Sequence, residues 1–273
     1  MLCGIDIFIM PDNLVANIVC IKWGDLYSAD DVNRLYAMVR RNVYKHALRF
    51  YCITEDASGL HPDITVKPIP EVQPLGNARI RNIYRKLALC DDDLGGLKEQ
   101  RALFLDLDIL VVDELDSMLA YPHGDDFVII NDWHTTGDRV GQASCFSWRV
   151  GTLGRIKRDF ESRPKDVIAQ YHTACQRYLS DMVRTTHGPL HFWPDAWCKS
   201  FKFHALPAWW VRAFRISRLP AGCKILAFHG APKMVDALNG RWSEQPQPLH
   251  KRLYKTIRPA HWIADHWHTR DLP

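Results

Sequence analysis

Two acidic residues interrupt the most apolar stretch of the chain. Asp106 and Asp108 stand one residue apart in the run 102–112, whose other members are all apolar. An unpaired buried carboxylate is unfavourable, so the pair predicts either a strand end where both carboxylates emerge or a bound cation. Carboxylate oxygens suit Mg²⁺ or Mn²⁺, and ligands of open α/β sheets bind at the carboxyl ends of strands. Taken alone, an Asp-x-Asp sequence is more simply a helix cap or a surface turn.

A second set of reactive side chains follows another apolar stretch, Ile225–Phe228. His229, Gly230 and Lys233 come directly after it. A neutral imidazole is a good ligand for Mn²⁺, a lysine four residues later can reach a phosphate, and glycine lets the backbone approach a ligand closely. A capping or packing role explains His229 equally well.

The charges are unevenly distributed along the chain. No carboxylate occurs between Asp195 and Asp236. The same interval holds seven cationic residues, namely Lys199, Lys202, Arg212, Arg215, Arg218, Lys224 and Lys233. Such a segment draws anionic ligands, although an ordinary basic surface would have the same composition. Together with a carboxylate pair that favours a divalent cation, it indicates a nucleoside diphosphate as ligand.

The overall composition excludes several classes of protein. With 273 residues and 47% hydrophobic content, the chain can form one large α/β domain or two small ones. A net charge of +4 is too small to suggest a general nucleic-acid-binding protein. The eight cysteines are scattered without a Cys-x-x-Cys pair, which favours a reducing cytoplasm. No signal peptide or membrane-spanning stretch is expected, so any membrane contact would be peripheral.

The elements that must position these residues alternate along the chain. A strand is expected over 17–21, a helix starts at Ser28 with Asp31 three residues on, and a second strand is expected over 49–54. This order predicts a βαβ unit and a parallel sheet. Further elements are expected as a basic helix over 80–90, strands over 64–67, 102–112, 127–130, 145–150 and 225–228, and mostly helix over 155–190.

Five blocks follow one another along the chain. They are Ile21-Lys22-Trp23-Gly24 with Tyr27 and the following 32–39, Arg49–Asp56, Phe104–Asp108, Trp193–Lys202 and Phe228–Lys233. In these blocks the chain resembles a group of bacterial glycosyltransferases, the GT-A-type enzymes with an Asp-x-Asp motif, similar to glycosyltransferase family 8. The resemblance covers about 17–236 of a single domain spanning 1–273, and leaves 237–273 as a basic tail containing Trp and His.

The resemblance implies a fold, a donor and a set of site residues. The fold would be a Rossmann-like, mostly parallel sheet flanked by helices. The donor would be a nucleotide-diphosphate sugar, and the resemblance favours a UDP-sugar. Mn²⁺ or Mg²⁺ would bind Asp106, Asp108 and His229. Lys233 would contact the diphosphate, and Lys86 the donor phosphates or sugar. The nucleotide would lie by three further residues, Trp23, Tyr27 and Thr54. The acceptor would be a glycan or a lipid-linked molecule of cell-surface polysaccharide synthesis, at the inner membrane face.

The chain departs from this group at one place. Ser180-Asp181-Met182 stands where relatives often carry a Gly-Asp-Gln-like triplet facing the donor sugar. Asp181 and Asp132 are the two candidate catalytic carboxylates, beside Lys233. The His229 block resembles retaining enzymes, whereas an inverting enzyme needs a carboxylate base. Two other classes stay open: a sugar nucleotidyltransferase, although only Gly24 follows the first strand, and a nucleotide-sugar-binding protein without turnover, which Met182 favours.

Overall fold

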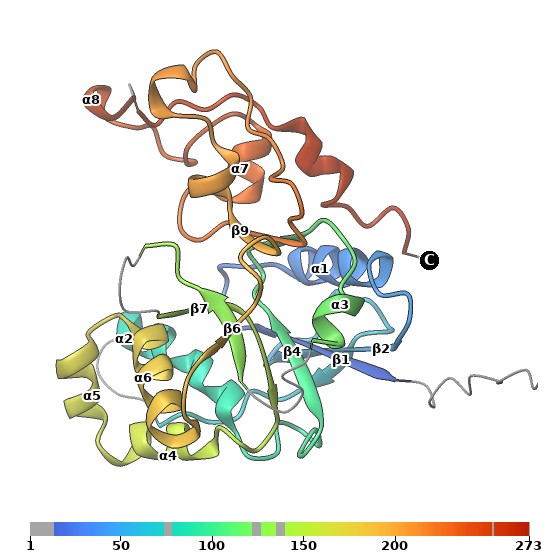
Figure 1. Ribbon diagram of the computed structural model, residues 1–273, viewed down its shortest axis with the longest axis vertical. Helices are drawn as coiled ribbons and strands as arrows, with labels where there is room; N and C mark the ends of the chain where they lie inside the picture. Colours follow the sequence, from blue (N-terminus) through green and yellow to red (C-terminus); the bar gives the residue numbers. More distant parts are fainter. Residues whose placement is uncertain (1–13, 74–77, 122–126, 135–139, 253, 273) are drawn as a thin grey trace, which may run out of the picture.

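A mostly parallel sheet of seven strands forms the base of the molecule (Figure 1). The computed structural model describes residues 14–73, 78–121, 127–134, 140–252 and 254–272. The sheet order is β3-β2-β1-β4-β7-β6-β8. Strands β3, β2, β1 and β4 run parallel, and β7 runs antiparallel to both of its neighbours. The bounds are Val15–Lys22 for β1, Ala47–Thr54 for β2, Thr65–Lys67 for β3, Arg101–Leu105 for β4, Val128–Asn131 for β6, Gly141–Arg149 for β7 and His191–Phe192 for β8. The predicted α/β class with a mostly parallel sheet is confirmed.

The first βαβ unit forms as its local sequence predicts. Helix α1, Ala29–Arg41, begins after Ser28, whose hydroxyl accepts a hydrogen bond from the backbone of Asp31 while the Asp31 carboxylate accepts one from the backbone of Ser28. This reciprocal cap satisfies two amide donors that a helix start leaves free. Val32 and Leu35 of the same helix are buried against the sheet. Both strands of the unit therefore end at the same sheet edge.

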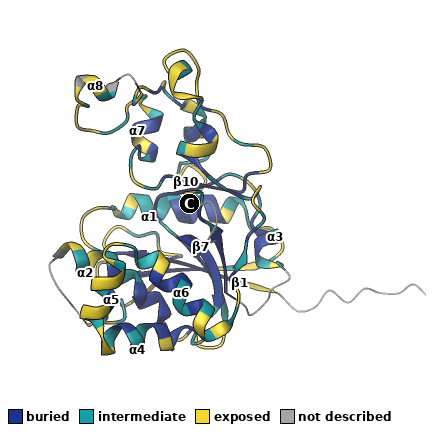
Figure 2. Ribbon diagram, turned by 60° about the vertical axis from the view of Figure 1, so that its left-hand side comes forward, coloured by how far each residue is buried: buried dark blue, intermediate teal, exposed yellow. Residues whose placement is uncertain are grey.

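Helices cover both faces of the sheet, whose central strands are buried (Figure 2). One buried cluster includes α1, and the other includes side chains from the central strands and from the helices drawn at the lower left of Figure 1. Those helices are α2, Ala78–Tyr84; the 3₁₀ helix Arg85–Cys90; α4, Gly154–Ser162; α5, Pro164–Tyr171; and α6, Cys175–His187. The helix predicted over 80–90 thus continues as a 3₁₀ helix from Arg85, and the helical prediction for 155–190 holds for three separate helices.

The strand predicted over 102–112 is split between two sheets, which corrects the sequence prediction. The chain leaves the large sheet after Leu105 and enters a three-stranded sheet at Ile109, with order β5-β10-β9. Strand β5 is Ile109–Val111, β9 is Cys198–Ser200 and β10 is Ile225–Ala227. Periodicity could not show the break, because the residues on both sides of it are completely buried.

A lobe built on the three-stranded sheet lies above the large sheet in Figure 1. Its short helices are a π-helix, Phe201–Ala205; a 3₁₀ helix, Trp209–Val211; α7, Met234–Leu238; α8, Leu249–Arg252; and a 3₁₀ helix, His261–Asp265. Helix α3, Asp116–Leu119, follows β5. The end of the chain packs back on the lobe, since Ile263 is buried and the Trp262 indole donates to the carbonyl of Ser217 at 3.0 Å. None of the helices in the described ranges is long and apolar enough to span a membrane.

Candidate active site

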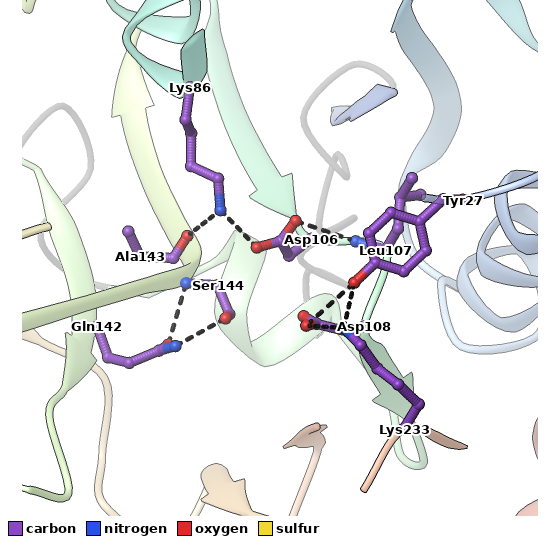
Figure 3. Close-up of polar contacts among 9 residues, drawn as sticks. All are labelled: Tyr27, Lys86, Asp106, Leu107, Asp108, Gln142, Ala143, Ser144 and Lys233. Carbon is purple, nitrogen blue, oxygen red and sulfur yellow. Dashed lines mark hydrogen bonds and ion pairs between the residues drawn. The ribbon is translucent and has the colours of Figure 1, made fainter. Parts of the chain in front are cut away.

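The Asp106–Asp108 turn lies where the two sheets meet. The amide of Asp106 donates to the carbonyl of Ser144 on β7 at 2.9 Å, and the carbonyl of Asp108 accepts from the amide of Phe228, just after β10, at 2.8 Å. The segment that carries the two carboxylates is therefore hydrogen-bonded to both sheets (Figure 3). The chain turns at Leu107 and Asp108, between the end of β4 at Leu105 and the start of β5 at Ile109.

Each carboxylate is neutralised by a lysine from a different element. Lys86, on the 3₁₀ helix after α2, forms an ion pair with Asp106 and donates to the carbonyl of Ala143 at 3.4 Å. Lys233, just before α7, lies 3.2 Å from Oδ2 of Asp108. Burial opposes the charge on Lys86, but the nearby Asp106 and Asp108 raise its pKa above the usual value. The site thus contains two acid–base pairs that meet from opposite sides of the turn (Figure 3).

Asp108 is the more buried carboxylate and is only half satisfied. Its Oδ2 accepts hydrogen bonds from the Tyr27 hydroxyl at 3.3 Å and from Lys233, which also donates to the Tyr27 hydroxyl at 2.6 Å. Its Oδ1 is buried and has no hydrogen-bond partner within the described part of the chain. Burial and the neighbouring Asp106 raise the pKa of Asp108. An anionic oxygen of this kind is ready to accept a cation.

Asp106, Asp108 and His229 line one cavity of about 300 Å³. Gly230 also lines it, with a φ of +74° that favours glycine, and a side chain there would meet the Lys202 ammonium at 3.2 Å. His229 is held by a 2.8 Å hydrogen bond between its Nε2 and the Ser200 hydroxyl, and its ring stacks on Trp133 at 5.5 Å. Burial and nearby cations lower the pKa of His229 to about 4, so the imidazole is neutral at pH 7.

The three predicted metal ligands are not grouped as a set. No cluster of three His, Cys, Asp or Glu side chains that could hold a metal occurs among the described residues. Lys86 and Lys233 pair with the carboxylates instead, and the Ser200 hydroxyl contacts Nε2 of His229. The carboxylates themselves fit a divalent cation, as the unpartnered Oδ1 of Asp108 shows. A metal ion at this turn stays a prediction.

Two of the residues predicted to lie by the nucleotide stand at the carboxyl edge of the large sheet. Thr54 ends β2 in register with Lys22 at the end of β1, and Trp23 follows directly. The Thr54 hydroxyl bonds to the backbone of Asp56, which forms the turn after β2. Neither Trp23 nor Thr54 is among the described residues that line the cavity. Both therefore flank the site. Tyr27 does not line the cavity either, but its hydroxyl contacts Asp108, which does.

Asp181 and Met182 are not among the described residues that line the cavity. Asp181 accepts from the Tyr171 hydroxyl at 3.2 Å and pairs with Arg184 at 3.3 Å, and Met182 packs in the apolar cluster behind the sheet. Gln176, in the first turn of α6, lines the cavity instead. Sequence reasoning missed it by less than two helical turns. The sequence signal for Gln176 was its amide side chain beside the start of α6. A side chain at that position faces the same sheet edge as Asp106.

Asp132 lies behind Gln176. One of its oxygens accepts from the Gln176 amide at 3.2 Å, and the other accepts from the backbone of His134 at 3.1 Å and contacts the His134 ring at 3.0 Å. Asp132 is 8% exposed and follows β6. An Asx-type turn is present, because the carboxylate of Asp132 caps the backbone two residues later. A connection to the cavity is present as well, through Gln176.

Comparison with solved structures identifies the architecture. The galactosyltransferase LgtC, solved with donor and acceptor sugar analogues, is similar over 80% of this chain and 88% of its own, at 16% identity and a TM-score of 0.53. The bifunctional glycosyltransferase WbbM matches 82% of this chain and 47% of its own, at 14% identity and a TM-score of 0.53. The fold is of the GT-A type. The glycosyltransferase GlyE of Streptococcus pneumoniae matches 92% of this chain and 62% of its own, at 13% identity and a TM-score of 0.53.

The likeness concerns the fold, since the identities are 16% or less. No protein-family model matches the sequence, and no curated protein matches it. In the GT-A fold of this chain, the acidic turn, Lys86 and the imidazole of His229 meet in one cavity.

Proposed function

We propose that the protein transfers a sugar from a nucleotide-diphosphate sugar, with a UDP-sugar as the first donor to test, to a glycan or lipid-linked acceptor. The observation that carries the proposal is the pairing of Asp106 with Lys86 and of Asp108 with Lys233 at one turn, whose two carboxylates line the cavity together with Lys86. The same cavity has groups for a cation and groups for an anion. A metal–diphosphate complex presents both charges. The GT-A fold, shared with glycosyltransferases, supports this use of the site.

Two lysines would hold and stabilise the diphosphate. Lys233 is one-third exposed, so its ammonium can turn from Asp108 toward a phosphate without crossing the core. Lys86 lines the cavity from the other side of the turn. A divalent cation on Asp106 and Asp108, with Mn²⁺ or Mg²⁺ as the expected ions, would supply further charge neutralisation for the leaving group. Positive groups placed where negative charge develops are an effective means of lowering the barrier.

The acceptor side is proposed near Gln176 and Asp132. Gln176 presents an amide to the cavity and bonds to Asp132 behind it. An inverting reaction would need a carboxylate to take the proton of the acceptor hydroxyl, and Asp132 is the candidate with a connection to the cavity. In a retaining reaction the leaving phosphate can take that proton. The anomeric configuration of the product distinguishes the two routes.

The test is a panel of nucleotide sugars, each incubated with the protein and Mn²⁺ while release of free nucleoside diphosphate is measured. We expect release with one donor and loss of release when Lys233 is replaced by Met. Lys45→Met, a change of an exposed lysine outside the cavity, is the matched control. Release that continues unchanged in the Lys233 variant would refute the assignment of the site.

A second candidate is a nucleotide-sugar-binding protein without turnover. The specific observation in its favour is that both carboxylates are already neutralised by lysines, with no three-ligand cluster among the described residues. Such a protein would bind nucleoside diphosphate without Mn²⁺ and would release none from any donor. Calorimetric titration with and without Mn²⁺, run beside the donor panel, separates the two functions.

A further inference from the structure

A row of large apolar side chains is exposed on the lobe. The segment 209–219 presents five of them to solvent, and we call this segment with its arginines the aromatic–basic surface. The exposed fractions are 55% for Trp209, 66% for Trp210, 79% for Phe214, 47% for Ile216 and 38% for Leu219. Single exposed apolar residues are ordinary, but a group of this size marks an interaction site.

The aromatic–basic surface is held in place by the lobe beneath it. Ser217, in its middle, is buried, and its carbonyl accepts from the Trp262 indole at 3.0 Å. The amide of Arg218 donates to the carbonyl of Ala205 at 3.0 Å. The guanidinium of Arg212 donates to the carbonyl of Tyr254 at 3.0 Å, which ties the start of the segment to the end of the chain. The apolar side chains are thus exposed by an ordered backbone.

The same segment carries positive charge without compensation. Arg215 and Arg218 are exposed and form no ion pair with any described residue. No carboxylate occurs in the sequence between Asp195 and Asp236. The nearest acids along the chain therefore lie outside the segment on both sides. An anionic partner would meet no carboxylate from this segment itself.

We propose that the aromatic–basic surface docks the protein on an anionic lipid bilayer. Trp and Phe side chains favour the boundary between headgroups and acyl chains, and arginines beside them attract anionic headgroups. A second copy of the chain is disfavoured as occupant, because the same arginines would face each other. A sugar-binding role for the tryptophans is disfavoured as well, since none of the five apolar residues lines the described cavity.

The surface is connected to the candidate active site. Phe203 belongs to the π-helix whose last residue, Ala205, is bonded to Arg218. The Phe203 ring stacks on His229 at 5.9 Å, and His229 lines the cavity. Docking would therefore bring one rim of the cavity toward the bilayer. This last step alone rests on the proposed function, since it concerns delivery of a lipid-linked acceptor.

The test measures co-sedimentation of the full chain with vesicles of phosphatidylcholine alone or mixed with phosphatidylglycerol. We expect binding to the mixed vesicles only. Each arginine near an anionic surface is worth about 1 kcal/mol, or roughly fivefold in affinity, so Arg215→Gln with Arg218→Gln should weaken binding about thirtyfold. Replacing Trp209, Trp210 and Phe214 by Ser should weaken it by about a thousandfold, since partial burial of each of the three rings contributes about tenfold.

Matched controls use exposed residues of another face. Tyr44→Ser removes a ring that is 70% exposed, and Lys45→Gln with Arg49→Gln removes two exposed charges. We expect all three changes to leave vesicle binding within about twofold, because surface charges far from the bilayer are screened within a Debye length of about 8–10 Å. Unchanged thermal unfolding of the surface variants verifies that they are folded.

Several results would overturn the proposal. They are absence of binding to the mixed vesicles, equal binding to both vesicle types, an equal loss in the control variants, and a dimer in solution that the ring substitutions dissociate. The assay contains no nucleotide sugar. A failure of vesicle binding is therefore distinct from a failure of the proposed transferase activity, which the donor panel measures without lipid.

Discussion

Replacement of Asp108 by Asn tests whether this carboxylate is retained for ligand binding at the expense of stability. The side chain is 9% exposed, its Oδ1 has no partner among the described residues, and its charge is opposed by burial and by Asp106. Buried acceptors left without a partner are unfavourable by about 1–3 kcal/mol. Asn has the same shape and no charge, so it removes this repulsion.

The substitution also loses a stabilising contact, which must be subtracted. The ammonium of Lys233, one-third exposed, pairs with Asp108 at 3.2 Å. Partly exposed pairs contribute about 0–1 kcal/mol, and Lys233 keeps its hydrogen bond to the Tyr27 hydroxyl at 2.6 Å. We therefore expect Asp108→Asn to be neutral or to stabilise the metal-free protein by about 1 kcal/mol. For a chain of this size the melting temperature would rise by roughly 2–4 °C.

The assay combines thermal unfolding in EDTA with calorimetric titration of nucleoside diphosphate in Mn²⁺. We expect the variant to melt at the same or a higher temperature and to lose the part of the affinity that depends on Mn²⁺. Asp132→Asn is the control with the opposite expectation, because both Asp132 oxygens are hydrogen-bonded, to His134 and Gln176. It should lower stability by about 1 kcal/mol. A lower melting temperature for Asp108→Asn together with full Mn²⁺-dependent binding would refute the reasoning.

Three further predictions concern other residues. Lys233→Met should weaken binding of nucleoside diphosphate by about tenfold or more, as the loss of a charged hydrogen bond, and should leave binding of the bare nucleoside unchanged by calorimetry; equal losses would show that Lys233 does not contact phosphate. Asp181→Asn should leave donor turnover within about twofold, since its partners are Tyr171 and Arg184 outside the cavity; a large loss in the release assay would return Asp181 to the site. Burial opposes ionisation of Asp116, but its hydrogen bonds hold its pKa below the usual value. The Asp116 carboxylate therefore stabilises the fold above the unfolded pKa of about 3.9, and this contribution disappears as pH falls through the lower folded pKa. Asp116→Ala should reduce the loss of the free energy of unfolding at acidic pH. Parallel plots of this free energy against pH for the two proteins would contradict the prediction.

Local signals explain most of what could be predicted from the sequence. The cap at Ser28 and Asp31 is encoded within four residues, and the βαβ order follows from alternating apolar runs. The turn at Asp106 and Asp108 was detectable because carboxylates are rare in a buried run. These features depend on neighbours in sequence, which is the information that a pattern contains.

The remaining features depend on contacts between distant residues. The run 102–112 divides between two sheets because β10, more than a hundred residues later, pairs with its second half. Lys86 reaches Asp106 because a 3₁₀ helix continues α2 at Arg85, and Gln176 rather than Asp181 faces the cavity because α6 begins at Cys175. Helix starts are uncertain by one or two residues from sequence, and such a shift rotates a different side chain into the site.

The two acid–base pairs give the site a physical reason to bind two ligands together. A diphosphate that draws Lys86 and Lys233 away would leave Asp106 and Asp108 as neighbouring anions in a poorly solvated turn, with Oδ1 of Asp108 already without a partner. A cation bound alone would leave two lysines beside it without their counterions. Either ligand bound alone would therefore break the ion pairs of Asp106 with Lys86 and of Asp108 with Lys233. With both ligands bound, every charge would again have a partner, because the carboxylates would face the cation and the ammonium groups would face the phosphates. Since a coupling between two ligands acts equally in both directions, charge balance at this turn favours the metal–diphosphate complex over either component.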